Sequence, residues 1–290
     1  MIDPVVIILS APYSHASAVC AMLGQHPELY ALPDTNLFLA DDVERVLAAH
    51  ASLGNGAGDG LSRLMAQLLE GEQGENAVAT AAQWLHEHGD WTSRRLLDFV
   101  YEKYQPRYLV DSSPSTGVNA ASLARMRTAY PDANFLHLVS HPRYAADRFT
   151  GDPAYADALR GLFETDPDIE SVWYVPNNLL AEFARSLPPG QCMRMRVEDL
   201  LGDARNYLLQ LAQWLDVSTS DESISAMLHP ENSPFAARGP VSAPGGMDVV
   251  FLDHPGMPAS TAPVSLAAGP AFGRVFSREA LKLAKEFGYR

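Results

Sequence analysis

The stretch that organises the chain is VVIILSAPYSHASAVCAML, residues Val5–Leu23. Its first five residues are apolar and mostly β-branched, which is typical of a strand buried on both faces of a sheet. A short polar turn follows and leads into an Ala-rich helix. The first backbone N–H groups of such a helix are unpaired and stabilise an anion such as phosphate or sulfate. The same pattern also describes an ordinary first strand–helix unit of an α/β domain, so both interpretations stand.

The composition allows a large core and disfavours anionic macromolecular partners. The chain has 290 residues, of which 47% are hydrophobic and 19% are charged, and this suits one large α/β domain or two small ones. Its formal net charge is −14, whereas nucleic acids and anionic membranes are bound through basic surfaces. We therefore expect no nucleic-acid partner and no membrane partner. Lysine occurs only at Lys103, Lys282 and Lys285, so an anion site in the first hundred residues must use Arg, His, hydroxyl or backbone N–H groups.

The two cysteines, Cys20 and Cys192, are far apart and each lies in an apolar run. This pattern indicates buried thiols rather than a disulfide framework or a zinc site, and we expect no metal. The apolar run Val5–Leu9 follows no basic segment and is too short for a signal sequence or a membrane span. We therefore expect a soluble, cytoplasmic protein.

Short apolar strands alternate with helical patterns along the rest of the chain. Arg107–Asp111, Phe135–Val139 and Cys192–Val197 are predicted strands, and the alternation is the signature of a parallel sheet with helices on both faces. We predict a single domain over residues 1–290, in which the Pro- and Gly-rich residues 229–270 form a covering loop or a disordered segment. The predicted helices cover 37–50, 61–69, 76–88, 94–104, 122–130, 144–149, 173–187, 203–215 and 277–287.

Several separated segments match one known pattern in the same order. They are Pro12–Ser17, Asp111–Ser115, Val139–Arg143 and Arg196–Leu200. With these segments the chain resembles the sulfotransferases that use 3′-phosphoadenosine 5′-phosphosulfate (PAPS) as donor. In that family the first segment wraps the 5′-phosphosulfate, and the third holds the 3′-phosphate. The resemblance implies the sulfotransferase fold, which is an α/β fold with a P-loop-like parallel sheet flanked by helices on both faces.

The resemblance also implies roles for individual residues. His15 would replace the family's cation at the leaving phosphate, and Asp34, which matches a Glu of the bacterial branch, would be the general base. Two plainer interpretations remain open, namely a loop histidine without a catalytic task and an aspartate that caps a helix. The residues implied to bind PAPS are Tyr13, Ser14, Ala16, Ser17, Ser140, Arg143, Arg148 and Arg238.

The donor motifs depart from the family pattern at several positions. Tyr13 stands where the family has Lys or Arg, and His15 stands where it has Gly. Ser140 and Arg148 exchange the family's Arg and Ser. A guanidinium makes bidentate contacts with phosphate. This exchange therefore either preserves binding of the 3′-phosphate from the opposite side or marks a site that is no longer used.

Residues 229–248 resemble sulfotransferases that serve polyketide and nonribosomal peptide assembly lines. The resemblance implies a transferase that moves a sulfuryl group from PAPS to a hydroxyl, either of a small molecule or of an intermediate tethered to a carrier protein. The alternative is a diverged homologue that no longer uses PAPS. Such a homologue would catalyse another acid–base reaction through His15 and Asp34, or would only bind a carrier protein.

Overall fold

A computed structural model describes most of the chain. The described residues are 4–54, 56–105, 108–151, 156, 160–163, 165–259, 265–266 and 276–290. Arg107, the first residue of a predicted strand, lies outside these ranges, as do residues 260–264 and 267–270 of the predicted covering loop.

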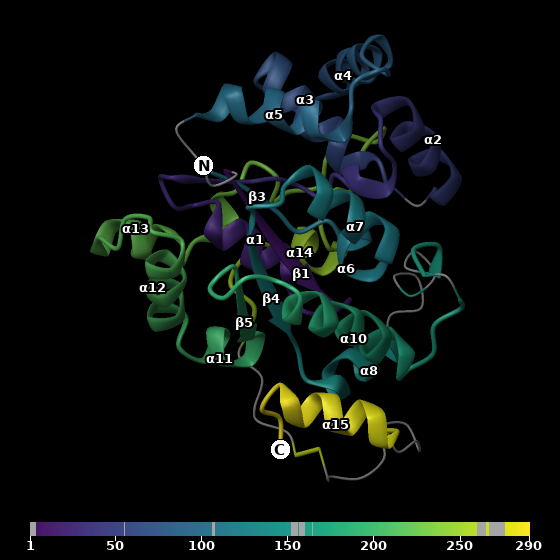
Figure 1. Cartoon of the computed structure of the whole chain (residues 1–290). Coiled ribbons are helices and arrows are strands. Elements are labelled where there is room, and N and C mark those ends of the chain that lie inside the picture. Colours follow the sequence, from purple (N-terminus) through teal and green to yellow (C-terminus); the bar gives the residue numbers. More distant parts are fainter. Residues whose placement is uncertain are drawn as a thin grey trace.

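Five parallel strands form one sheet in the order β2-β3-β1-β4-β5. The central strand, β1, pairs with β3 on one side and with β4 on the other (Figure 1). Their bounds are β1 Val5–Ser10, β2 Leu29–Ala31, β3 Tyr108–Asp111, β4 Asn134–Val139 and β5 Cys192–Arg196. The predicted parallel sheet is confirmed. One boundary differs, because Val197 begins a helix instead of ending the last strand.

Helices and two short 3-10 turns connect and cover the strands. Among the described residues no helix is both long and apolar enough to span a bilayer. The elements are α1 Ala16–Leu23, η1 Leu37–Leu39, α2 Val43–Leu53, α3 Asp59–Glu70, α4 Glu75–Glu87, α5 Ser93–Tyr104, α6 Pro114–Val118, α7 Ala120–Ala129, α8 Pro142–Gly151, α10 Ser171–Arg185, α11 Val197–Gly202, α12 Ala204–Trp214, α13 Asp221–Ala226, η2 Pro230–Asn232, α14 Val249–Asp253 and α15 Arg278–Glu286.

Alternate residues of β1 pack into two different hydrophobic clusters. Ile7 and Leu9 belong to a cluster with buried residues of α2, α3, α4, α5, α7 and α10. Val6 and Ile8 belong to a second cluster with residues of α1, α11, α12 and α13. Because successive side chains of a strand point to opposite faces, these clusters lie on the two sides of the sheet. The run of β1 is apolar without interruption because the strand is buried on both faces.

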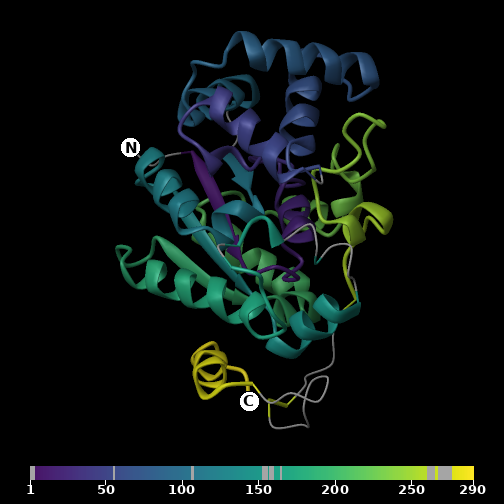
Figure 2. The ribbon, with the colours of Figure 1, turned by 90° about the vertical axis from the view of Figure 1, so that its right-hand side faces the viewer.

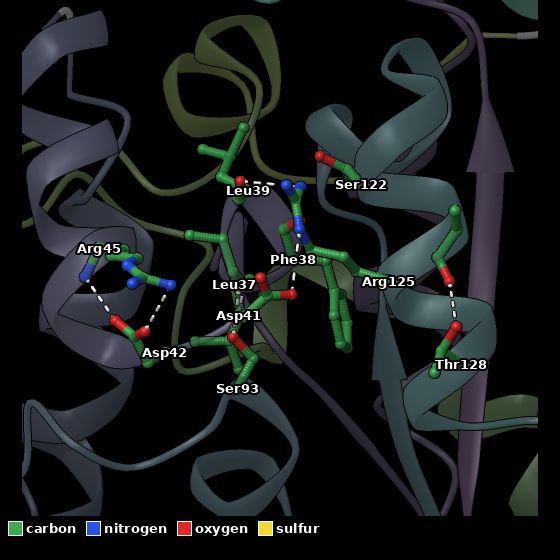
Figure 3. Close-up of polar contacts among 12 residues, drawn as sticks. Leu37, Phe38, Leu39, Asp41, Asp42, Arg45, Ser93, Ser122, Arg125 and Thr128 are labelled. Carbon is green, nitrogen blue, oxygen red and sulfur yellow. Dashed lines mark hydrogen bonds and ion pairs between the residues drawn. The ribbon is translucent and has the colours of Figure 1, made fainter.

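The helix predicted over residues 37–50 is in fact two elements. The 3-10 turn η1 ends at Leu39, and α2 starts only at Val43, where the Asp42 side chain accepts a hydrogen bond from the Arg45 backbone N–H. Between them the chain is extended. The Arg125 guanidinium donates to the Leu39 carbonyl and pairs with Asp41, and these contacts hold the break in place (Figure 3). An aspartate is a strong N-cap, which is why the helix begins after it.

Residues 229–259, here called the strap, form the continuous described part of the predicted covering loop. They contain η2 and α14 and run along one side of the molecule beside α3 (Figure 2). The strap places Phe235 and Phe251 in the same hydrophobic cluster as Ile7. The buried Arg63 of α3 donates to the carbonyls of Ala237 and Gly245 at 2.8 and 2.6 Å. The strap is therefore a packed part of the fold.

Candidate functional site

A pocket lies at the carboxyl end of β1, where parallel α/β sheets commonly bind their ligands. It encloses about 390 Å³, part of which is open to solvent. One wall is the loop Ser10–Ser17 between β1 and α1. The other walls come from the turn after β2, the region after β3, and the strap, and they consist of Asp34, Ser112, Pro114, Val118 and Asp248.

The loop has left-handed backbone at two residues that are not glycine. Tyr13 has φ 64° and His15 has φ 55°. Such a conformation costs a residue with a Cβ about 1–2 kcal/mol, and strain of this kind gathers at functional sites. A third left-handed residue, Asn36 with φ 47°, follows shortly after the pocket residue Asp34. The loop thus has a backbone conformation that glycine adopts most easily, and α1 begins directly after it.

Two serine side chains of the loop connect it to distant segments. The Ser14 hydroxyl donates to the Ala11 carbonyl at 2.7 Å and lies 3.2 Å from the Ser140 hydroxyl. The Ser17 hydroxyl accepts a hydrogen bond from the Asp248 backbone N–H at 2.9 Å. The loop is therefore held by the turn after β4 on one side and by the strap on the other.

His15 contacts α8 through its ring. Its Nε2 atom is 2.7 Å from the Tyr144 hydroxyl, and the two rings lie 5.2 Å apart. Arg148, one turn further along α8, is close enough for its charge to act on the same histidine. Burial lowers the pKa of His15, and Arg148 adds to this effect, while the Asp248 carboxylate opposes it. His15 is consequently neutral at pH 7 when the pocket holds no anion.

Asp34 faces the loop from the turn after β2. Its Oδ1 atom is buried, and the Ser112 hydroxyl interacts with the carboxyl group. Its backbone N–H donates to the Gly246 carbonyl of the strap at 2.7 Å. Burial, together with the nearby Asp111 and Asp248, raises the pKa of Asp34 well above its ordinary range. The helix-cap interpretation does not hold, because the caps of η1 and α2 are Asn36 and Asp42.

Asp111 ends β3 beneath the pocket and organises the turn that follows. Its carboxylate accepts hydrogen bonds from the Ser113 hydroxyl at 2.7 Å and from the Thr35 hydroxyl at 3.4 Å. Burial raises the pKa of Asp111 to about 6, although these hydrogen bonds oppose the rise. Thr35 follows Asp34, so this network ties the segment that carries Asp34 to the end of β3.

Of the remaining residues singled out from the sequence, some line the pocket and others lie outside its lining. Tyr13, Ser14, Ala16 and Ser17 line the pocket. Ser140 is fully buried, touches Ser14 and accepts a hydrogen bond from the Trp173 indole at 2.7 Å. The others lie beyond the lining residues. Arg143 and Arg148 are on α8, and Arg238 is exposed on the strap, where it pairs with Asp253 of α14 at 2.6 Å.

A family model described as the sulfotransferase family matches residues 4–221. This chain belongs to the sulfotransferase family. Its structure is similar to the sulfotransferase domain from the curacin biosynthetic pathway, with 21% identity, TM-score 0.80 and coverage of 98% of this chain and 97% of that one. It is also similar to the sulfotransferase domain from the Synechococcus PCC 7002 olefin synthase, with 25% identity, TM-score 0.75 and coverage of 99% and 94%. The predicted sulfotransferase fold is confirmed. None of the curated proteins compared matches the chain.

Sequence reasoning did not single out Tyr144, which contacts His15, or Asp248, which lines the pocket of this sulfotransferase-family chain. Tyr144 and Arg148 are four residues apart in a predicted helix, and this spacing places both on one face, as the structure has them. Asp248 lies beyond the matched residues 4–221. It directly precedes the apolar run VVFL, which is a recognisable helix start, and its carboxylate caps α14. No local signal in the sequence places either residue at the pocket.

The backbone and hydroxyl groups of the pocket suit a sulfuryl or phosphoryl group. The charge of the pocket suits such an anion only in part. The loop backbone, the start of α1 and the two serines offer N–H and hydroxyl groups of the kind that hold such anions. The described lining residues include no Lys and no Arg, but they include Asp34 and Asp248. Arg148 supplies the cation that acts on His15. Within the described part of the chain, no group of His, Cys, Asp and Glu could hold a metal ion.

Proposed function

We propose that the protein transfers a sulfuryl group from PAPS to a hydroxyl of a natural-product intermediate. The observation that carries the proposal is the loop Pro12–Ser17, whose left-handed residues and adjoining helix start form an anion cradle at the end of β1. Membership of the sulfotransferase family supports a transferase. The two similar structures, which are named as sulfotransferase domains of a biosynthetic pathway and of an olefin synthase, support the natural-product setting.

Each pocket group then has a defined task. In sulfuryl transfer the sulfur–oxygen bond to the phosphate breaks, a sulfur–oxygen bond to the acceptor forms, and 3′,5′-adenosine bisphosphate (PAP) leaves. Asp34 takes the hydroxyl proton, and its raised pKa brings this carboxylate toward the range in which a general base is most effective. An anion beside His15 favours the imidazolium form, so the histidine takes up a proton as the donor binds and stabilises charge at the leaving oxygen.

Ser140, Arg143 and Arg148 are proposed to hold the 3′-phosphate. Arg148 is already within electrostatic reach of His15, and Ser140 contacts the loop through Ser14. Both groups therefore lie next to the cradle. Arg238 is proposed for the same task, and it has to leave its ion pair with Asp253 to take part.

A second candidate function is favoured by the carboxyl groups of the pocket. Asp34 and Asp248 line it without a Lys or Arg among the described lining residues. A homologue that had abandoned PAPS would keep such a cleft, and it would use His15 and Asp34 as acid and base on an assembly-line intermediate or only bind the carrier protein. The acceptor in either case is a small molecule or a carrier-tethered hydroxyl compound.

Calorimetric titration with PAP separates the two candidates. We expect micromolar binding that Arg148→Ala weakens about tenfold or more, because a charge-assisted contact with phosphate is lost. Arg205→Ala is the matched control, since Arg205 is exposed on α12 and pairs with Asp221. We expect its affinity to equal that of the wild type. Absence of binding at millimolar PAP would overturn the use of PAPS.

Transfer itself is tested with PAPS and paired acceptors. The same hydroxyacyl group is offered as a free small-molecule ester and as a thioester on a carrier protein. Formation of a sulfated product from either one supports the proposal and identifies the acceptor form. A protein that binds PAP but sulfates neither would direct the search to other hydroxyl compounds.

A further inference from the structure

The His15 side chain has two ring nitrogens, and the fold engages one of them. Its Nε2 atom is 2.7 Å from the Tyr144 hydroxyl, and the two rings lie 5.2 Å apart. His15 lines the pocket, whereas Tyr144 belongs to α8 and lies outside the described lining. Nδ1 is therefore the ring nitrogen that remains for a group bound in the pocket.

Backbone contacts fix both partners of this pair. The His15 carbonyl accepts a hydrogen bond from the Val19 N–H of α1 at 3.0 Å, and the Tyr144 N–H donates to the His141 carbonyl at 2.9 Å. The Tyr144 ring packs against the hydrophobic cluster that contains Tyr13 of the same loop. The geometry of the pair is thus set by the fold itself.

A phenol hydroxyl that keeps its proton is a suitable donor for a neutral imidazole nitrogen. Burial raises the pKa of the Tyr144 hydroxyl; Arg148 opposes this rise, and Asp248 and Glu198 add to it. The hydroxyl is therefore protonated at neutral pH, and Nε2 of His15 is the acceptor that the structure gives it. A neutral imidazole carries one N–H, and the hydrogen bond at one nitrogen decides which nitrogen carries it. Donation to Nε2 places the His15 proton on Nδ1.

The same contact persists when His15 is protonated. An imidazolium carries an N–H at both nitrogens, and the Tyr144 oxygen then accepts from Nε2, because a hydroxyl can donate or accept. The charge of Arg148 disfavours this protonated form and the charge of Asp248 favours it. In either state an Nδ1–H group is available to an oxygen atom in the pocket.

We propose that Tyr144 is a positioning residue for sulfuryl transfer: its hydroxyl holds Nε2 of His15, so that the Nδ1–H group donates to the leaving oxygen of the donor. The inference rests on the proposed function and names the atom that acts in it. When the bond from sulfur to this oxygen breaks, the oxygen keeps the electron pair, and a hydrogen bond from Nδ1 stabilises the charge. In the product PAP the same oxygen belongs to the 5′-phosphate.

Nitrogen NMR of the full chain tests the tautomer in the absence of nucleotide. The ¹⁵N chemical shifts of an imidazole distinguish a protonated ring nitrogen from a bare one, and His15→Asn identifies the signals of His15. At about pH 8, where the side chain is neutral, we expect the proton on Nδ1 in the wild type. Tyr144→Phe should spread it over both nitrogens, because the hydroxyl that selects one of them is gone. A wild-type proton on Nε2, or a variant that keeps it on Nδ1, would overturn the inference.

Calorimetry with two nucleotides tests the contact with the leaving oxygen. PAP carries the 5′-phosphate, and adenosine 3′-monophosphate lacks it. We expect Tyr144→Phe to weaken PAP binding about tenfold, the effect of one charge-assisted hydrogen bond, and to leave the affinity for adenosine 3′-monophosphate unchanged. In a His15→Asn background the same change should have no further effect, because Tyr144 acts through the histidine.

Tyr174→Phe is the matched control. Tyr174 is a half-buried tyrosine of α10 that packs against the same cluster as Tyr144 and lies outside the described pocket lining. This variant should bind both nucleotides as the wild type does, and thermal unfolding of both Phe variants checks that they are folded. Equal weakening for both nucleotides, or by both variants, would show a merely structural role for Tyr144 and overturn the inference.

The outcomes separate this inference from the proposed function. PAP binding that Tyr144→Phe leaves unchanged overturns the inference and keeps the use of PAPS intact. If neither nucleotide binds, the use of PAPS fails, and so does the contact with its leaving oxygen. The nitrogen spectra then still decide whether Tyr144 sets the tautomer of His15, because they need no nucleotide.

Discussion

The chemistry of Asp34 depends strongly on its surroundings. An aspartate in water is ionised far below neutral pH, but the Asp34 carboxyl is buried near Asp111 and Asp248, and its pKa is raised well above that range. A general base acts only in its deprotonated form. Activity that depends on Asp34 therefore declines as the pH falls through this raised pKa, and it is fully present above it.

We predict that kcat/KM for sulfuryl transfer rises with pH well beyond the range of an ordinary carboxylate. Asp34→Asn should lower kcat about 100-fold or more at every pH, because the loss of a positioned base has this size. The measurement is the pH–rate profile of both proteins, with Asp42→Asn as the control for an Asp to Asn change outside the pocket. A wild-type profile that stays flat down to about pH 5 would contradict the role of Asp34.

His15 is neutral in the free protein and is expected to gain a proton when an anion binds beside it. Binding that takes up a proton becomes tighter as the pH falls toward the pKa of the free group. We predict that PAP binds more tightly at about pH 6 than at about pH 8. His15→Asn should lose this part of the pH dependence. Asparagine tolerates the left-handed backbone of this position, so the loop conformation is kept.

The ligand's own phosphate groups titrate equally with both proteins. The difference between the two pH series, each measured by calorimetry, therefore belongs to His15. Equal slopes for wild type and variant would show that the histidine has no part in binding the anion.

At the scale of elements, a buried guanidinium anchors the strap. Arg63 is 2% exposed and donates to the Ala237 and Gly245 carbonyls of the strap and to Gln73. Burial lowers the pKa of Arg63 to about 10, so the group stays charged at neutral pH. The segment that carries Asp248 is thus fixed to α3 from within the protein.

We predict that Arg63→Met lowers the free energy of unfolding by about 2–4 kcal/mol, because the Ala237 and Gly245 carbonyls lose a charged donor that is itself buried. Arg125→Met is the comparison, since Arg125 also donates to two carbonyls, those of Phe38 and Leu39, but its side chain is 34% exposed (Figure 3). The loss for Arg125→Met should be about 1 kcal/mol, because this guanidinium is partly solvated in the folded protein and its hydrogen bonds contribute less. Urea unfolding measures both, and equal losses would contradict the account of burial.

At the scale of the whole molecule, buried histidines make the fold sensitive to acid. His50 is 7% exposed, and its ring interacts with the backbone of Thr35 and Asn36, which favours the protonated form and opposes the effect of burial. Burial lowers its pKa to about 4 from 6.5. His137 in β4 is held between the Arg194 guanidinium and Asn177, and its pKa is lowered to about 3, mainly by burial. Both side chains are therefore neutral in the folded protein.

When folding lowers the pKa of a histidine, its full contribution to the free energy of unfolding is present at pH values above the pKa that it has in the unfolded chain. The contribution is lost as the pH falls below about 6.5, because the unfolded chain then binds a proton that the folded one rejects. For His50 this loss is about 2 kcal/mol between about pH 7.5 and about pH 5. We predict that over this pH interval the free energy of unfolding of His50→Leu falls by about 2 kcal/mol less than that of the wild type. Urea unfolding at both pH values measures the difference, and equal losses would contradict it.

The strands and the loop could be predicted from the sequence because their signals are local. The run Val5–Leu9 is apolar at every position, since both faces of the sheet are covered, and the polar turn after it opens a helix. The break after η1 was harder to place. It depends on Asp42 as a cap and on Arg125, which reaches it from α7 far along the chain.

The sequence predicted the loop wall of the candidate site and Asp34, but not the residues that meet them from distant segments. Ser14, His15 and Ser17 follow one another in the loop, and Asp34 comes from a matched segment of the same family. By contrast, Tyr144 meets His15 across a separation of 129 residues, and Asp248 meets Ser17 across 231. No periodicity or turn pattern connects residues so far apart.

The sequence by itself determined the family, the parallel sheet and the loop that we propose as an anion cradle, because apolar periodicity and turn chemistry act over a few neighbouring residues. The tertiary structure alone decided that Asp248 and Ser112 face that loop, and that Asp34 and His15 have shifted pKa values. Burial and the distance between charges are properties of the folded chain. They set the free energy of each protonation state, and with it the chemistry that the pocket can perform.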